Sequence, residues 1–112
     1  MSKADILLRE AERDLEIGCY NKAVSAVYFA VRMELETLAR KLGGNVPRSD
    51  DKLINVLKHL GKEELALDAL YLYERRKGAD YGSQSLDERL ARKCLILGRK
   101  IIMQVRDLYQ KL

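Results

Sequence analysis

The segment from Asn21 to Leu42 constrains the fold of this chain more than any other stretch. Its apolar residues recur at alternating intervals of four and three, at positions Val24, Tyr28, Val31, Leu35, Leu38 and Leu42. This spacing places them on one side of an α-helix. Alanine and valine residues widen that side in the first half of the segment, whereas charged residues are confined to the second half. Because such a helix needs neighbours around it, the pattern predicts the central helix of a bundle.

Helical periodicity continues in four other segments, and turn-forming residues separate them. The expected helices cover residues 3–17, 51–60, 62–77 and 85–112. Ser2 is suited to cap the first of these helices, and Gly18 and Gly61 are suited to end two of them. Ser85 and Glu88 have the spacing of a capping box, which predicts the start of the last helix.

The remaining segments contain turns and loops, and residues 78–84 are expected to form one loop. No segment has the alternating pattern of a strand, so the fold class is all-α. With 112 residues the chain is long enough for one modest core. We therefore expect a single domain over residues 1–112, folded as an antiparallel up-and-down bundle of four to five helices.

Composition narrows the classes of protein to which this chain can belong. The chain has 21 basic and 17 acidic residues, and no stretch approaches the roughly 20 apolar residues that span a bilayer. The N-terminus has no apolar run of the kind found in signal peptides, and the chain has two cysteines, so we expect a cytoplasmic protein without membrane contact. No Glu-x-x-His pair, glycine-rich phosphate loop or CxxC motif occurs, so neither a metal nor a cofactor is expected.

Three consecutive cations, Arg75, Arg76 and Lys77, end the helix expected over residues 62–77. Cations at this position favour the helix dipole, which is one interpretation of the cluster. Arg76, however, continues the inward register of the apolar residues before it, so it needs an anionic partner. That partner is either Asp80, which would make a structural ion pair, or the phosphate of a ligand. Both interpretations remain open at this point.

A second basic region lies in the last expected helix. Its cations are Arg89, Arg92, Lys93, Arg99, Lys100, Arg106 and Lys111. Most of them project opposite the apolar side, so this face is either a solvated outer surface or a surface for an acidic partner such as RNA. Because no aromatic residues alternate with these cations, sequence-specific reading of single strands by this face is not expected.

Three motifs occur in a characteristic order along the chain. They are Gly18-x-Tyr20-Asn21-x-Ala23, Tyr28-Phe29-Ala30 and Arg76-x-x-Ala79-Asp80-Tyr81-Gly82. Together they resemble the HEPN domains of bacteria and archaea, in particular the small free-standing members. The resemblance covers nearly the whole chain. It implies an antiparallel four- to five-helix bundle, commonly a homodimer, often encoded beside a minimal nucleotidyltransferase as a toxin–antitoxin-like pair.

Catalytic HEPN proteins are metal-independent ribonucleases, and their signature is an arginine followed four to six residues later by a histidine. Here the corresponding positions hold Asp80, counted from Arg75, and Tyr81, counted from Arg76, while the only histidine is His59. Without an imidazole the ordinary general base for a ribose 2′-hydroxyl is missing, and a phenol with a pKa near 10 is a poor substitute.

Two functions therefore stay open. One is a binding or regulatory module that acts with a minimal nucleotidyltransferase and binds nucleotide or RNA. The other is an atypical, toxin-like ribonuclease without the usual histidine. The missing imidazole favours binding.

We expect the functional site at the end of the bundle where the 62–77 helix stops and the central helix begins. If the helix over residues 51–60 is a short excursion, four helix ends meet there. The residues expected to bind nucleotide or RNA phosphate are Arg75, Arg76, Asp80, Tyr81 and Asn21. No catalytic residue is assigned. For the homodimer, the apolar residues left over for an interface are Ala26, Phe29, Ile96 and Ile102.

Overall fold

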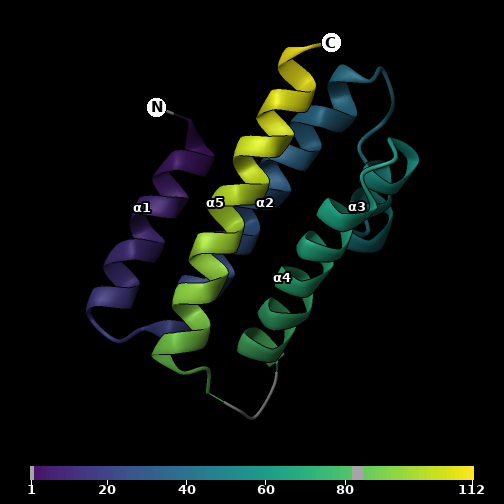
Figure 1. The fold of residues 1–112 in the computed structure, drawn as a ribbon. Coiled ribbons are helices and arrows are strands. Elements are labelled where there is room, and N and C mark those ends of the chain that lie inside the picture. The colour runs from purple at the N-terminus through teal and green to yellow at the C-terminus, as the bar shows by residue number, and fades with distance from the viewer. Residues whose placement is uncertain (1, 82–84) are drawn as a thin grey trace.

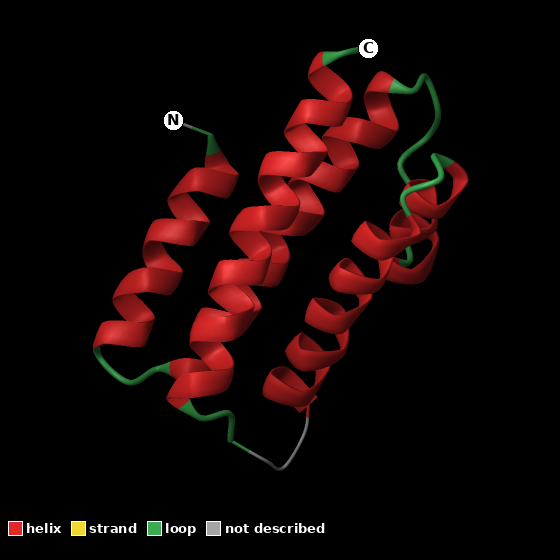
Figure 2. Cartoon of the chain, in the orientation of Figure 1, coloured by secondary structure: helices red, strands yellow, loops and turns green. Residues whose placement is uncertain are grey.

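The computed structural model describes residues 2–81 and 85–112, with the side chain of Tyr81 excepted. In this part of the chain five helices form an antiparallel bundle (Figure 1). They are α1 (Lys3–Glu16), α2 (Tyr20–Lys41), α3 (Asp50–His59), α4 (Glu63–Tyr81) and α5 (Glu88–Gln110). The described residues form helices and connecting loops, and none of them lies in a strand (Figure 2). The expected all-α bundle is confirmed. Within the same residues, no helix is both long and apolar enough to cross a bilayer.

The ends of α1 and α3 follow the local signals in the sequence. Ser2 caps α1 because its hydroxyl oxygen accepts a hydrogen bond from the Asp5 backbone N–H at 3.2 Å, and the Asp5 carboxylate accepts one from the Ser2 N–H at 3.3 Å. Gly18 and Gly61 follow α1 and α3 with φ values of 81° and 76°, a conformation that favours glycine. These local signals fix where the chain reverses direction.

Helix α2 is the centre of the bundle, as the sequence predicts. It contacts each of the other four helices. Its apolar stripe is fully buried, and the residues with 0% exposure include Val24, Val27, Tyr28, Val31, Leu35 and Leu38. Burying side chains of this size from several sides supplies most of the hydrophobic stabilisation of such a fold.

Helix α5 approaches α2 closely at Gly98. A Cβ atom at this position would lie 2.3 Å from Cγ1 of Val27 and 3.8 Å from Cδ1 of Leu72, so only glycine fits without a shift of its neighbours. Gly98 thereby allows α5 to pack directly against α2 and α4.

Three expectations for the second half of the chain are wrong. Helix α4 continues through Gly78 to Tyr81, because contacts of its last turn with α2 offset the cost of a glycine within a helix. Asp87, and not Ser85, caps α5, since the Asp87 carboxylate accepts a hydrogen bond from the Leu90 N–H at 2.8 Å. The buried side of α5 is also broader than expected.

Ile102 illustrates this last difference. Although it was expected at a dimer interface, it is 2% exposed and belongs to the core of the bundle. The reason is that α5 packs against α1, α2 and α4 and therefore buries more than one stripe.

Candidate functional site

Four helix ends gather at one end of the bundle, which we call the α4 end. Helices α1 and α4 stop there, and α2 and α5 begin there (Figure 1). This arrangement is the one expected from a short α3. It brings residues from the start of α2 close to residues from the last turns of α4.

Asn21 connects three segments at the α4 end. Its side-chain amide donates a hydrogen bond to the Ala79 carbonyl at 3.4 Å, and its amide oxygen accepts one from the Leu86 N–H at 2.9 Å. One half-buried side chain thus ties the start of α2 to the last turn of α4 and to the segment before α5. Both polar ends of the amide are used within the fold, so Asn21 positions the site.

The Arg76 side chain points toward α2 and forms an ion pair with Asp80, one turn further along α4 itself. The Arg76 Nε atom lies 2.9 Å from the Asp80 carboxylate, whose other oxygen accepts a hydrogen bond from the Ser25 hydroxyl. The guanidinium also lies over the Phe29 ring, 4.7 Å from its centroid. Its side chain is only 16% exposed. This geometry corresponds to the structural ion pair that the sequence left open.

Arg75 projects on a different side of α4, toward α5. Its guanidinium carbon lies 5.2 Å from the centroid of the Tyr71 ring, and the Lys93 ammonium of α5 lies 4.8 Å from the same centroid. We call these three residues the Arg75–Lys93 cluster. The Cys94 thiol lies next to both cations. Burial raises the pKa of this thiol to about 11, while the charges of Arg75 and Lys93 act in the opposite direction.

In the part of the chain that the structure describes, the cluster holds two cations and no anion. Among the residues described, neither Arg75 nor Lys93 forms an ion pair, and the Arg75 Nε atom is buried without a hydrogen-bond partner. Cation–π contacts with Tyr71 compensate the two charges only in part. The cluster therefore has the unused charge and hydrogen-bonding capacity that an anionic ligand requires.

The other cations of α5 are largely neutralised by acids of the same chain. Arg92 pairs with Glu88, Arg99 with Glu12, Lys100 with Asp68, Arg106 with Glu34 and Asp5, and Lys111 with Asp107. In the described part of α5 only Arg89 and Lys93 lack an acidic partner. The continuous basic face considered from the sequence is thus reduced to its first turns, beside Arg75.

Two candidates remain, Tyr81 and His59, and neither places an imidazole at the α4 end. The side chain of Tyr81, which ends α4, lies outside the described residues. His59 is exposed and ends α3, just before α4 begins. From Glu63 to Arg76 the helix rises about 20 Å, so His59 lies at the opposite end of α4 from the two arginines.

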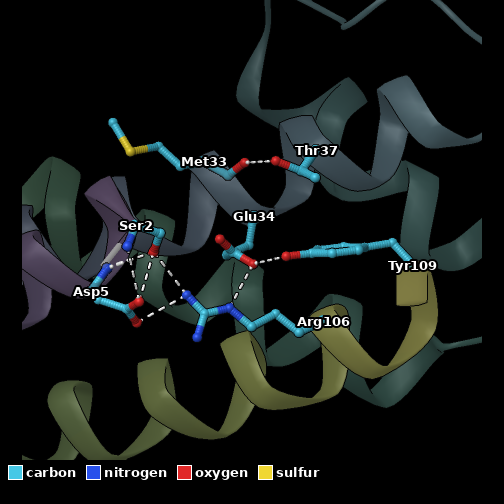
Figure 3. A network of polar contacts seen from close by, with 7 residues as sticks. All are labelled: Ser2, Asp5, Met33, Glu34, Thr37, Arg106 and Tyr109. Atoms are coloured by element: carbon cyan, nitrogen blue, oxygen red, sulfur yellow. Dashed lines mark hydrogen bonds and ion pairs between the residues drawn. The ribbon is translucent and has the colours of Figure 1, made fainter.

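A polar network that sequence reasoning missed occupies the opposite end of the bundle (Figure 3). Glu34 of α2 is 5% exposed. One of its carboxylate oxygens accepts hydrogen bonds from the Arg106 Nε at 3.0 Å and from the Tyr109 hydroxyl at 2.7 Å. Arg106 also donates to Asp5 at 2.9 Å and to the Ser2 hydroxyl at 3.1 Å. The signal in the sequence was a glutamate beside the apolar stripe of the central helix, which needs a partner when buried.

The pKa values in this network follow from its contacts. Burial opposes the charge of Arg106, but its hydrogen bonds to Glu34 and Asp5 raise its pKa above the ordinary range. Hydrogen bonds from Ser2 and Arg106 lower the pKa of Asp5. Burial and the bond to Glu34 raise the pKa of Tyr109. Each charged group of the network is paired within it, so the network serves the fold.

Comparison with known proteins gives a family match over nearly the full length of the chain. Residues 1–108 match the family model of the HEPN domain. The resemblance inferred from three short motifs is thereby confirmed. No curated protein matches the chain.

Proposed function

Because the chain belongs to the HEPN domain family, which covers nucleotide- and RNA-related roles, we propose that it is a binding and regulatory module. It holds a phosphate group of a nucleotide or RNA at the α4 end of the bundle. A minimal nucleotidyltransferase, the partner implied by the family resemblance, acts with it.

The observation that carries this proposal is the Arg75–Lys93 cluster, whose two cations pair with no acid among the described residues. Two cations that share one ring repel each other, and a phosphate between them would relieve that repulsion. The planar guanidinium offers paired donors that match phosphate oxygens, and the lysine adds a charge on a flexible stem. Apart from Arg89, the other basic residues of α5 are already paired with acids, so a ligand would have to compete for them.

The residues expected from the sequence divide into two roles under this proposal. Arg75 contacts the phosphate directly. Arg76, Asp80 and Asn21 hold the last turn of α4 against α2 and so position Arg75. A role for the Tyr81 side chain stays a prediction. Binding is favoured over ribonuclease chemistry because the only histidine lies about 20 Å from this end.

We also propose that the module forms a homodimer, as the family resemblance implies. Phe29, one of the apolar residues considered for its interface, is 38% exposed and so is available for contact. Light scattering at micromolar protein concentration tests this proposal, and a 12.9 kDa monomer would contradict it.

The function is tested by titrating fluorescent RNA and nucleotides with the protein at low salt. Arg75→Ala should weaken binding about tenfold, because it removes a charge-assisted contact. Arg99→Ala is the matched control, since Arg99 is an α5 cation already paired with Glu12 and its loss should change affinity little. Circular dichroism verifies that both variants fold. Absence of binding by the wild type, or equal loss in the two variants, would contradict the proposal.

A further inference from the structure

The outer surface along the line where α4 and α5 face each other changes in character along its length, and we call it the α4–α5 surface. The two helices run antiparallel, and an ion pair between Asp68 and Lys100, at 3.1 Å, joins them across it. The Arg75–Lys93 cluster lies toward one end of this surface. On the other side of the ion pair lies a hollow of about 790 Å³. Asp68 and Arg75 are two helical turns apart, so the cluster and the hollow are separated by about 10 Å.

The hollow does not extend the positive charge of the cluster. Its charged lining residues are Lys62, Glu63, Glu64, Asp68, Lys100, Arg106 and Asp107. Two of these cations are already held, Lys100 by Asp68 and Arg106 by Glu34 and Asp5. Among the described residues Glu63 and Glu64 have no basic partner, and Lys62 is the one cation of the lining that no acid holds against them. A phosphodiester backbone that continued from the cluster into the hollow would therefore approach unpaired carboxylates.

Between the cluster and the hollow lies a short apolar stretch. The Tyr71 ring is half-buried beneath the two cations. Ile96 lies one turn after Lys93 on α5 and is 68% exposed, and Leu67 lies one turn before Tyr71 on α4 and is 60% exposed. Nucleobases stack on aromatic rings, and exposed aliphatic side chains beside such a ring add apolar area that a base can cover. The order along the α4–α5 surface is therefore cations, apolar side chains and carboxylates.

We infer that the α4–α5 surface accepts one phosphorylated nucleotide unit and excludes the continuous backbone of a longer strand. The phosphate lies between Arg75 and Lys93, both within about 5 Å of the Tyr71 centroid, and the base covers the apolar stretch. The unit is either a free mononucleotide or the terminal nucleotide of an RNA. This inference rests on the proposed function and specifies which ligands the same site takes.

Affinity as a function of ligand length tests the inference. Adenosine, AMP, a 5′-phosphorylated dinucleotide and 5′-phosphorylated oligoadenylates of increasing length are titrated into the wild-type protein. We expect AMP and the dinucleotide to bind at least tenfold more tightly than adenosine, and no more than a threefold gain for longer strands. The affinity for AMP should fall as the salt concentration rises, because screening weakens the attraction between its phosphate and the two cations.

The two sources of the nucleotide unit separate in the same titration. If AMP binds and the 5′-phosphorylated 20-mer does not, the ligand is a free nucleotide. If both bind equally and a 20-mer with a 5′-hydroxyl does not, the ligand is an RNA end. A steady rise in affinity of tenfold or more from the dinucleotide to the 20-mer would overturn the inference and leave the proposed function intact. If no ligand binds at all, both fail.

Charge reversal in the hollow provides a gain-of-function test. The double variant Glu63→Lys with Glu64→Lys removes the acidic barrier, so long strands should bind at least tenfold more tightly to it than to the wild type. AMP affinity should change less than threefold. The matched control is Glu10→Lys with Asp51→Lys, two exposed acids outside α4 and α5 whose reversal changes the net charge equally. Equal gains in both double variants would mean that net charge alone governs length dependence, which would overturn the inference.

Discussion

The two ends of this bundle each place an arginine of a long helix near tyrosine and charged side chains, with opposite outcomes. At one end Arg106 donates hydrogen bonds to Glu34, Asp5 and Ser2 (Figure 3). At the α4 end Arg75 lies over Tyr71 beside Lys93, and no described acid pairs with either cation. Both arginines are half-buried. The difference shows that the neighbours of a cation, and not its exposure, decide whether it serves the fold or stays available to a ligand.

Exchanging each arginine for methionine gives the largest expected contrast between the ends. Arg106→Met leaves Glu34 buried without its cation, which should lower the free energy of unfolding by about 3 kcal/mol. Arg75→Met removes one of two mutually repelling charges, so the free energy of unfolding should change by less than about 0.5 kcal/mol. Urea unfolding followed by circular dichroism measures both values. Similar losses in the two variants would mean that Arg75 also stabilises the fold, and the distinction between the ends would disappear.

A smaller effect is expected from Asn21→Ala, which removes the connection within the α4 end. Two hydrogen bonds are lost, each with a net contribution of about 1 kcal/mol to stability. The free energy of unfolding should therefore fall by about 1–2 kcal/mol. Affinity for phosphate ligands should also fall, because the last turn of α4 is no longer held in place. Asn55→Ala is the matched control, since Asn55 is exposed on α3. A variant as stable as the wild type would show that the two hydrogen bonds of Asn21 contribute nothing to stability.

The smallest effect sharpens the description of the opposite end by its pH dependence. The pKa of Asp5 is lowered in the folded protein, chiefly by its bonds with Ser2 and then Arg106. The charged form of Asp5 therefore stabilises the fold above its unfolded pKa, near 3.9, and this contribution disappears as the pH falls through the lower folded value. Asp5→Asn should thus lower the melting temperature at pH 7 and much less at pH 3. A difference that stays constant over this range would exclude a contribution from the charge.

The fold was largely predictable because its determinants are local. The alternating apolar positions of α2 identify the central helix, and Ser2, Gly18 and Gly61 mark helix ends through their own backbone preferences. Where the sequence misled, a distant contact was responsible. Helix α4 passes Gly78 because Asn21 and Ser25, more than fifty residues away, bind its last turn.

The site was harder to predict for the same reason. Arg75 and Arg76 point about 100° apart on one helix, but only the packed bundle shows that Arg76 meets α2 and that Arg75 meets α5. Similarly, no local pattern reveals that Arg99 pairs with Glu12 or that Arg106 pairs with Glu34. The sequence therefore predicted correctly that α5 is rich in basic residues, but it did not show that acids of the same chain pair with most of them.

The close approach at Gly98 has a consequence for how this fold diverges over evolution. Charged residues around the α4–α5 surface can be exchanged one at a time, because solvent adapts to each change. Position 98 cannot, since any side chain there would collide with Val27 in the core. Lineages should retain glycine at this position unless the residue facing it first becomes smaller. Positions 27 and 98 are thus expected to change as a coupled pair, while the neighbouring ligand surface drifts independently.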